Sequence, residues 1–327
     1  MNLLKNRTIK IFIIFAITLL FTGCFSKVQM FQNSSDPLKE TVLEGDGEQK
    51  ILLIPIHGVI SSDSSKRMLG PSKPGMMPEF ISKLKKAESD ESIKAVIISI
   101  NSPGGTVTAS DIIYNEIRSF KKKTNKKVIV IMMDVAASGG YYVSIPADYI
   151  IAHPTTITGS IGVITMRQDL KGLMSKIGIG VTVYKSGKNK DMGSPFRIST
   201  GEEKKMMQNI VTNLANRFVG LVVKKRGISG EKLKRIKTAR VFLPREALEV
   251  GLIDKIGYFK DAVKKAKQLS KIPENSQVVV YKRSQYFDDN VYNSAGANIK
   301  RSDKSLLGLD IIPNYKTGFY YMWVPGE

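Results

Sequence analysis

The residues of this chain that could do covalent chemistry centre on Ser138, which lies in the segment DVAASGGYYV between two alanines and two glycines. Small neighbours let a substrate backbone approach a serine hydroxyl, and glycine amides are free to point toward the group that the hydroxyl attacks. A serine nucleophile needs a base to take its proton. The chain has only 2 histidines, His57 and His153, and neither lies in a setting typical of a catalytic base. The sequence therefore indicates a nucleophile whose base is not a histidine.

Lysines downstream of Ser138 are candidates for that base. Lys185, Lys188 and Lys190 lie in the segment VYKSGKNKDMGSPFR, where a predicted strand runs into a glycine-bearing loop. A lysine accepts a proton only when neutral, so its pKa, ordinarily about 10.4, must be lowered by burial among few charges. A second hydroxyl could hold the amine in line, and the segment TTITGSIGV offers Ser160. Residue types alone leave the choice among the three lysines open, since a lysine in a polar loop is usually solvated.

Two glycine-bearing turns follow consecutive apolar runs: NSPGG comes after AVIISI, and AASGG comes after VIVIMMD. In a parallel sheet both turns would lie at the carboxyl ends of neighbouring strands, where α/β proteins place their sites. The amide of Gly104 or Gly105 and that of Gly139 could then converge on one oxyanion. The alternative is that these glycines only make turns. Neither turn carries a phosphate-binding glycine motif or the G-x-S-x-G sequence of α/β-hydrolases.

The elements that must position these residues alternate between strands and helices, which predicts an α/β fold with a largely parallel sheet. Continuous apolar runs indicate buried strands, and apolar residues at helical spacing indicate helices. We expect strands at 51–60, 93–101, 126–134, 148–154, 161–166 and 180–185, and helices at 77–91, 109–124, 169–177, 200–227, within 240–257, and at 258–270.

The amino terminus predicts export. Positive charges in MNLLKNRTIK precede the uncharged apolar run IFIIFAITLLFTGCF, so residues 1–23 are expected to be a signal peptide or membrane anchor. The end of this run resembles the lipobox of bacterial lipoproteins, with Cys24 as the lipid attachment site and Phe21 where leucine is usual. An uncleaved anchor is the alternative. Residues 24–50 read as a tether, and Cys24 is the only cysteine, so no internal disulfide can form.

Composition limits the classes of partner. The formal net charge of +21 raises the possibility of nucleic-acid binding, but the lysines are spread along the chain without a recognised nucleic-acid motif. We therefore expect a solvated basic surface and no nucleic-acid partner. Neither histidine has a cluster of further ligands, so no metal is expected. The polar tail, residues 272–327, ends in aromatic residues that we expect to pack on the body, with docking to a neighbouring copy as the alternative.

Four motifs, NSPGG, AASGGYY, TGSIGV and YKSGKNKDMGSP, occur in this order and together resemble the bacterial signal peptide peptidase A family, in its short, single-domain form. These serine-lysine peptidases share the crotonase and Clp-protease fold, a ββα spiral with mostly parallel sheets and flanking helices. The resemblance covers about residues 51–270 and implies a peptidase domain at 51–271. It implies no cofactor.

The resemblance also implies a role for each motif residue. Ser138 would be the nucleophile, Lys190 the base, and Ser160 the hydroxyl that hydrogen-bonds the lysine amine. Gly104 or Gly105, with Gly139, would supply the oxyanion donors. Asp191 adjoins Lys190, and a carboxylate beside the amine would stabilise its charged form, so we expect Asp191 to point away.

The function that follows is that of a membrane-tethered endopeptidase that degrades cleaved signal peptides and similar apolar peptides through an acyl-enzyme. The resemblance implies a homo-oligomer, a ring or dome that could be an octamer, in which adjacent copies supply the serine and the lysine. We expect it in the bacterial cell membrane with the catalytic domain on the extracytoplasmic side. The alternatives are an acyl-CoA enzyme of the crotonase fold and a catalytically inactive lipoprotein scaffold.

Overall fold

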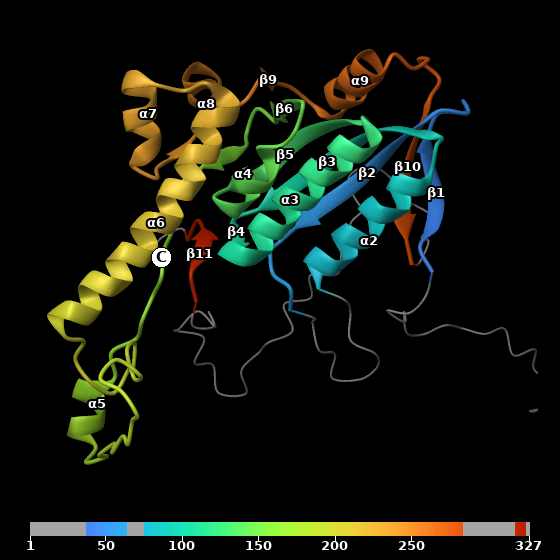
Figure 1. Cartoon of the computed structure of the whole chain (residues 1–327). Helices are drawn as coiled ribbons and strands as arrows, with labels where there is room; N and C mark the ends of the chain where they lie inside the picture. Colours follow the sequence, from blue (N-terminus) through green and yellow to red (C-terminus); the bar gives the residue numbers. More distant parts are fainter. Residues whose placement is uncertain (1–36, 64–74, 284–317, 325–327) are drawn as a thin grey trace, which may run out of the picture.

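The centre of the molecule is a mostly parallel nine-stranded sheet with helices on both faces (Figure 1). The computed structural model describes residues 37–63, 75–283 and 318–324. The main path of the sheet has the order β1-β10-β2-β3-β5-β6-β9, and β7 and β8 extend from β5. The bounds are β1 Lys39–Glu44, β2 Lys50–His57, β3 Ile93–Ser102, β5 Lys127–Ala137, β6 Tyr149–Ala152, β7 Ile157–Gly159, β8 Val241–Phe242, β9 Lys255–Ile256 and β10 Gln277–Lys282. The short strands β4, Gly104–Thr106, and β11, Tyr320–Met322, form a second sheet.

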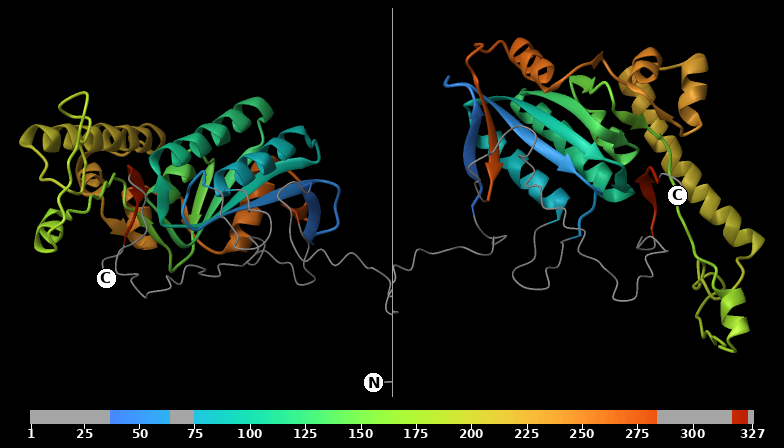
Figure 2. Two further views of the ribbon diagram at one scale, coloured as in Figure 1. Left: turned by 90° about the horizontal axis from the view of Figure 1, so that it is seen from below. Right: turned by 180° about the vertical axis from the view of Figure 1, so that it is seen from behind.

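Helices cover the two faces of the sheet because its strands are apolar on both sides. In β2, Leu52 and Ile54 belong to one buried cluster, and Ile51 and Leu53 belong to the other. The first cluster packs under α2 (Met76–Ser89), α3 (Val107–Thr124) and α4 (Gly139–Ser144), and the second packs under α9 (Phe259–Ser270). Figure 2 shows the same layers from below and from behind.

Most of the predicted elements are confirmed. The three long apolar runs form β2, β3 and β5, paired in parallel register. The helices expected at 77–91, 109–124 and 258–270 form α2, α3 and α9. The Clp-protease-like α/β fold is also as expected. Thr106 begins α3 by accepting a bond from the Ala109 amide, and Asn125 ends it in the left-handed conformation.

The strands predicted at 161–166 and 180–185 are wrong. Ile164 makes only an isolated bridge with Tyr320, and residues 180–185 form no strand. A strand needs a neighbour to bond its amides and carbonyls, and 180–185 pairs with no strand among the residues that the structure describes. Val181, Val183 and Tyr184 are consequently exposed, Tyr184 to 95%.

The sheet extends beyond the limits 51–271 that we expected for the domain. Strand β1 lies inside the segment expected to be a tether and pairs antiparallel with β10, which lies in the expected tail. β10 in turn pairs in parallel with β2. Residues Tyr320 to Met322 are buried, as expected for aromatic packing. Residues 1–23 and Cys24 lie outside the described residues, and none of the described helices is long and apolar enough to cross a membrane.

A protrusion extends from the sheet along α6 (Gly201–Arg226), with α7 (Gly230–Lys237) and α8 (Pro244–Val250) beyond its other end. The short helix α5 (Lys171–Lys176) and residues 177–200 lie at the amino end of α6, away from the sheet (Figures 1 and 2). Polar contacts join the middle of α6 to the body, since Arg217 and the Tyr142 hydroxyl both donate to Asp111, at 2.7 and 2.6 Å.

Candidate active site

Ser138 lies at the junction of β5 and α4 in a strained backbone conformation, with φ 52° and ψ −112°. Its amide donates to the Gly159 carbonyl at 2.7 Å, and its carbonyl accepts from the Tyr142 amide at 2.8 Å. The side chain is buried, and its Oγ has no hydrogen-bond partner among the described residues. A buried hydroxyl at a strained turn with no hydrogen-bond partner is typical of a functional residue that bonds to a further group, such as a base or a substrate.

The two glycine turns predicted to meet do lie side by side. The Asn101 side chain donates to Asp134 at 2.8 Å and accepts from the Val135 amide at 3.2 Å, so it ties the end of β3 to β5. Gly104 and Gly139 then come into contact: a Cβ built on Gly104 would lie 2.8 Å from the Gly139 nitrogen. Only glycine fits there, because Gly104 has φ 108° and the same Cβ would lie 1.9 Å from the Tyr321 carbonyl oxygen.

Strand β11 lies along this turn, a contact that the sequence did not predict. Tyr321 pairs with Gly105, and Met322 pairs with Gly104. The Gly104 amide is bonded to Ser102 Oγ at 3.1 Å. The ring of Tyr321 stacks on that of Tyr142, with 4.8 Å between the ring centroids, and holds β11 in place. A three-residue strand has too little pattern to be recognised, and the terminal aromatics were the only signal.

Ser160 lies next to Ser138 in space. It directly follows β7, whose Gly159 pairs with Ala137 at the end of β5. Ser160 also has positive φ, 50°, and its amide donates to the Arg240 carbonyl at 2.8 Å. The structure therefore brings together Ser138, Ser160 and the glycine turns.

Lys190 does not join them within one chain. It lies in a turn in which its amide donates to the Gly187 carbonyl at 3.1 Å, on the exposed segment 177–200. That segment belongs to the protrusion, whereas α4, which begins after Ser138, packs against the body (Figure 1). One chain thus carries the nucleophile and the predicted base in separate places.

The three candidate lysines differ in their partners. Lys185 forms an ion pair with Asp191 at 2.7 Å, and Lys188 pairs with Glu202. The hydrogen bond that Lys188 donates to Glu202 raises the pKa of this lysine, which keeps it protonated. In the part of the chain that the structure describes, no carboxylate forms an ion pair with Lys190, whose neighbour Asp191 bonds to other cations, as expected.

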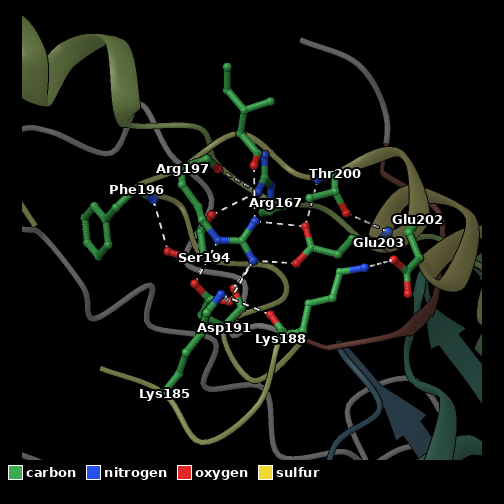
Figure 3. A network of polar contacts seen from close by, with 11 residues as sticks. Arg167, Lys185, Lys188, Asp191, Ser194, Phe196, Arg197, Thr200, Glu202 and Glu203 are labelled. Carbon is green, nitrogen blue, oxygen red and sulfur yellow. Dashed lines mark hydrogen bonds and ion pairs between the residues drawn. The ribbon is translucent and has the colours of Figure 1, made fainter. Parts of the chain in front are cut away.

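Arg197 is the centre of the polar network around this turn (Figure 3). Its guanidinium donates to both carboxylate oxygens of Asp191, at 2.8 and 2.7 Å, and to both oxygens of Glu203. Glu203 in turn accepts from the Thr200 amide at 2.8 Å and so caps α6. This network was not predicted from the sequence, although the pattern T-x-x-E at Thr200 is a capping signal that could have indicated Glu203.

Neither histidine belongs to the site. His153 Nδ1 lies 2.8 Å from Thr155 Oγ1, and its ring packs against Tyr258. His57 is exposed at the end of β2. No group of three or more His, Cys, Asp and Glu side chains that could hold a metal ion occurs among the residues that the structure describes.

Comparison with known proteins connects this geometry to a family. The sequence profile of Peptidase family S49 matches residues 120–273, and that of Clp protease matches residues 57–156. A protein of Enterococcus faecium named signal peptide peptidase SppA is 35% identical over 254 residues, which are 78% of this chain and 73% of that protein. The chain belongs to Peptidase family S49. It is a serine protease of the signal peptide peptidase A group.

Two further relatives differ in length. A protein of Methanocaldococcus jannaschii named as a protease is 42% identical over 205 residues, which are 62% of this chain and 64% of the relative. Protease 4 of Haemophilus influenzae is 39% identical over 211 residues, which are 64% of this chain and only 34% of the relative. The matched region of this S49 peptidase therefore corresponds to about a third of the Haemophilus protein.

Proposed function

We propose that this S49 peptidase is a membrane-tethered endopeptidase that degrades cleaved signal peptides with Ser138 as nucleophile and Lys190 as base. The observation that carries the proposal is the buried, unpartnered Oγ of Ser138 at a strained turn beside Gly139 and Gly104. Ser160 follows the neighbouring strand, where a second hydroxyl can orient an amine.

The choice of Lys190 rests on its surroundings as well as on its motif. Lys185 pairs with Asp191, and Lys188 pairs with Glu202, whose carboxylate raises the Lys188 pKa. Lys190 has no such partner among the described residues. It is therefore the lysine of this segment that a neighbouring surface can cover without burying a paired carboxylate.

A second copy of the chain is proposed to complete the site. The segment with Lys190 extends away from Ser138 of its own chain, and it exposes apolar side chains that water would otherwise solvate poorly. These are Ile177, Ile179, Val181, Val183, Tyr184, Phe196 and Ile198. Packing this segment on the neighbouring body in a ring or dome would bury them, and a strand of the neighbour could pair with 180–185. Both effects would desolvate Lys190 beside the neighbour's Ser138.

The proposed reaction has two halves. Ser138 Oγ attacks the peptide carbonyl carbon while the neutral amine of Lys190 takes the hydroxyl proton. The oxyanion is held by the Gly139 amide and by that of Gly104 or Gly105, and the Gly104 amide would exchange its bond to Ser102 Oγ for one to the oxyanion. The protonated lysine then gives its proton to the leaving amine, which leaves an ester on Ser138. Water, deprotonated by the same lysine, hydrolyses that ester.

The substrate and location belong to the same proposal. Signal peptides are suggested by the name of the Enterococcus relative and by the predicted export signal at residues 1–23 with Cys24. Tethering at the extracytoplasmic side of the membrane would place the domain near apolar peptides left in the bilayer.

A pH profile tests the proposal. Cleavage of an apolar signal-like peptide is measured for the wild type, Ser138→Ala and Lys190→Ala, together with acylation of Ser138 by an active-site probe. We expect both variants to be inactive and wild-type activity to rise with an apparent pKa below the free-lysine value of about 10.4. Activity in Lys190→Ala would refute the assigned base. A protein whose Ser138 reacts at no pH would support the scaffold alternative.

A further inference from the structure

Arg197 joins a carboxylate of the Lys190 segment to a carboxylate of α6. Asp191 directly follows Lys190 in the chain, and Glu203 lies in the first turn of α6. The Asp191 carboxylate is bonded to Nε and one terminal nitrogen of Arg197, a bidentate arrangement that fixes both distance and orientation. The other side of the same guanidinium binds Glu203, whose side chain is only 2% exposed. The turn that carries Lys190 is thereby tied to the amino end of α6.

The backbone around Lys190 depends on this tie because it has no strand or helix of its own. Its internal bonds are isolated turns, from the Lys190 amide to Gly187 and from the Ser194 amide to Asp191, at 3.1 and 3.0 Å. Arg197 also donates to the Asp191 carbonyl at 3.3 Å, and Arg167 donates to the Ser194 carbonyl at 2.9 Å. Without the guanidinium, the turns would keep only the exposed ion pair of Lys188 with Glu202 as a link to α6 among the described residues.

The same contacts control the charge next to Lys190. Hydrogen bonds from Arg197, and then from Lys185, hold the pKa of Asp191 far below its ordinary value, so its carboxylate is ionised and occupied. Arg197 and the Thr200 amide lower the pKa of Glu203 to about 2. Two further ion pairs surround this network, Arg167 with Asp169 and Lys188 with Glu202. Both carboxylates of the Arg197 cluster are therefore turned to other cations and away from Lys190.

We infer that Arg197 is a positioning residue of the peptidase: it fixes the Lys190 turn on α6 and occupies the Asp191 carboxylate that would otherwise pair with the Lys190 amine. This inference rests on the proposed role of Lys190 as the base. Removal of the guanidinium leaves Lys185 bonded to Oδ1 of Asp191 and frees Oδ2, one residue away from that amine. A carboxylate within about 4–6 Å of a lysine favours the charged form and raises the lysine pKa by about 1–3 units.

The test compares the acid limb of the pH profile in Arg197→Gln with that of the wild type. We expect the limb to move to higher pH by about one unit or more, which means a loss of about tenfold or more below the limb and recovery above it. Adding Asp191→Asn to Arg197→Gln removes the freed carboxylate and should bring the limb back toward the wild-type position. Arg235→Gln removes an arginine and its ion pair with Glu246 on α7 and α8 and should leave the limb unchanged.

A second measurement does not depend on activity. In the Ser138→Ala background, an amine-reactive reagent labels Lys190 at a rate that follows its neutral fraction, and mass spectrometry of the peptide gives that rate against pH. Arg197→Gln should shift the half-labelling point upward, and the added Asp191→Asn should reverse the shift. Circular dichroism and gel filtration confirm that each variant is folded and assembled as the wild type is.

The outcomes separate the two proposals. An unchanged acid limb together with an unchanged labelling curve in Arg197→Gln overturns the positioning role, even if activity falls equally at every pH. If Lys190→Ala stays active, the base itself has been misassigned, and the proposed function fails independently of Arg197. If Lys190→Ala is inactive and the limb shift is reversed by Asp191→Asn, both proposals are supported.

Discussion

Backbone strain marks Ser138 and Ser160 as positions that the fold holds in place at a cost. Five non-glycine residues of the described chain have positive φ, and three of them, Asn125, Ala239 and Lys271, lie at the carboxyl ends of helices, where this conformation is common. Ser138 and Ser160 instead follow strands β5 and β7. Such conformations cost on the order of 1–3 kcal/mol each and cluster at functional sites.

At the residue scale, Gly104→Ala should both destabilise the protein and abolish activity. An alanine at φ 108° is strained by roughly 1–3 kcal/mol, and its Cβ would overlap the Tyr321 carbonyl oxygen and press on the Gly139 nitrogen. Urea unfolding and peptide cleavage measure the two effects.

Gly220→Ala is the matched control, because Gly220 lies inside α6 with nothing within 4 Å of an added Cβ. It should stabilise the protein by about 0.5–1 kcal/mol with activity unchanged. Wild-type stability and activity in Gly104→Ala would show that β11 can move away without consequence, against the close packing of this turn.

At the element scale, apolar runs predicted the strands that are buried on both faces. They did not predict the strands that depend on pairing with a distant segment. β2, β3 and β5 are buried on both faces, so their residue types alone identify them. β1 has the half-exposed pattern KETVLE, and its partner β10 lies at the opposite end of the chain, so no local signal places it in the sheet. The segment 180–185 has strand-forming residues but no partner strand in the described ranges 37–63, 75–283 and 318–324.

The candidate site likewise contains residues that the sequence predicts and residues that only the fold brings together. Ser138 and the glycine turns follow buried strands, so their meeting could be predicted from the sequence alone. Lys190 could be distinguished from Lys185 and Lys188 only by resemblance, because the difference lies in which lysine has an acidic partner. Arg197 and Tyr321 act through contacts between segments whose relative placement only the fold determines.

The cap of α6 should respond to acid. The pKa of Glu203 falls from 4.5 in its unperturbed form to about 2 in the folded protein, chiefly through the hydrogen bond from Arg197. Its contribution to stability is therefore complete above about pH 4.5 and is lost as the pH falls toward 2. Glu203→Gln should unfold at lower urea concentration than the wild type at pH 7, and the difference should shrink below pH 4.5.

Glu231→Gln provides the comparison for that experiment. Glu231 pairs with Lys234 on the surface of α7, with both side chains more than 70% exposed, so its loss should change the unfolding midpoint little at any pH. A Glu203→Gln difference that stays constant from pH 7 to pH 3 would show that lost packing, and not the ionised cap, accounts for the effect.

At the scale of the whole molecule, α6 connects the body to the protrusion. Its middle is held by Arg217 and by Phe218, whose ring packs against Tyr142 and Tyr321. Its first turn holds the Lys190 segment through Glu203. Lys190, the proposed base, is therefore placed relative to its own body by one helix. In the proposed assembly, its distance from the neighbour's Ser138 would be determined by how two copies pack.

Mixed assemblies of Ser138→Ala and Lys190→Ala chains should consequently regain activity that neither variant has alone. A site that takes its serine from one copy and its lysine from the next is intact only where a Lys190→Ala chain supplies the serine and a Ser138→Ala chain supplies the lysine. For a closed ring mixed at random in equal amounts, this combination occurs at about one quarter of the sites, which limits recovery to about a quarter of wild-type activity. The chains are co-expressed with different tags, purified through both tags and assayed on the signal-like peptide. Ser138→Ala co-expressed with the double variant Ser138→Ala/Lys190→Ala has no intact serine and must remain inactive. No recovery in properly assembled mixed rings would mean that Ser138 and Lys190 of the same chain meet, which would require the protrusion to fold back onto its own body.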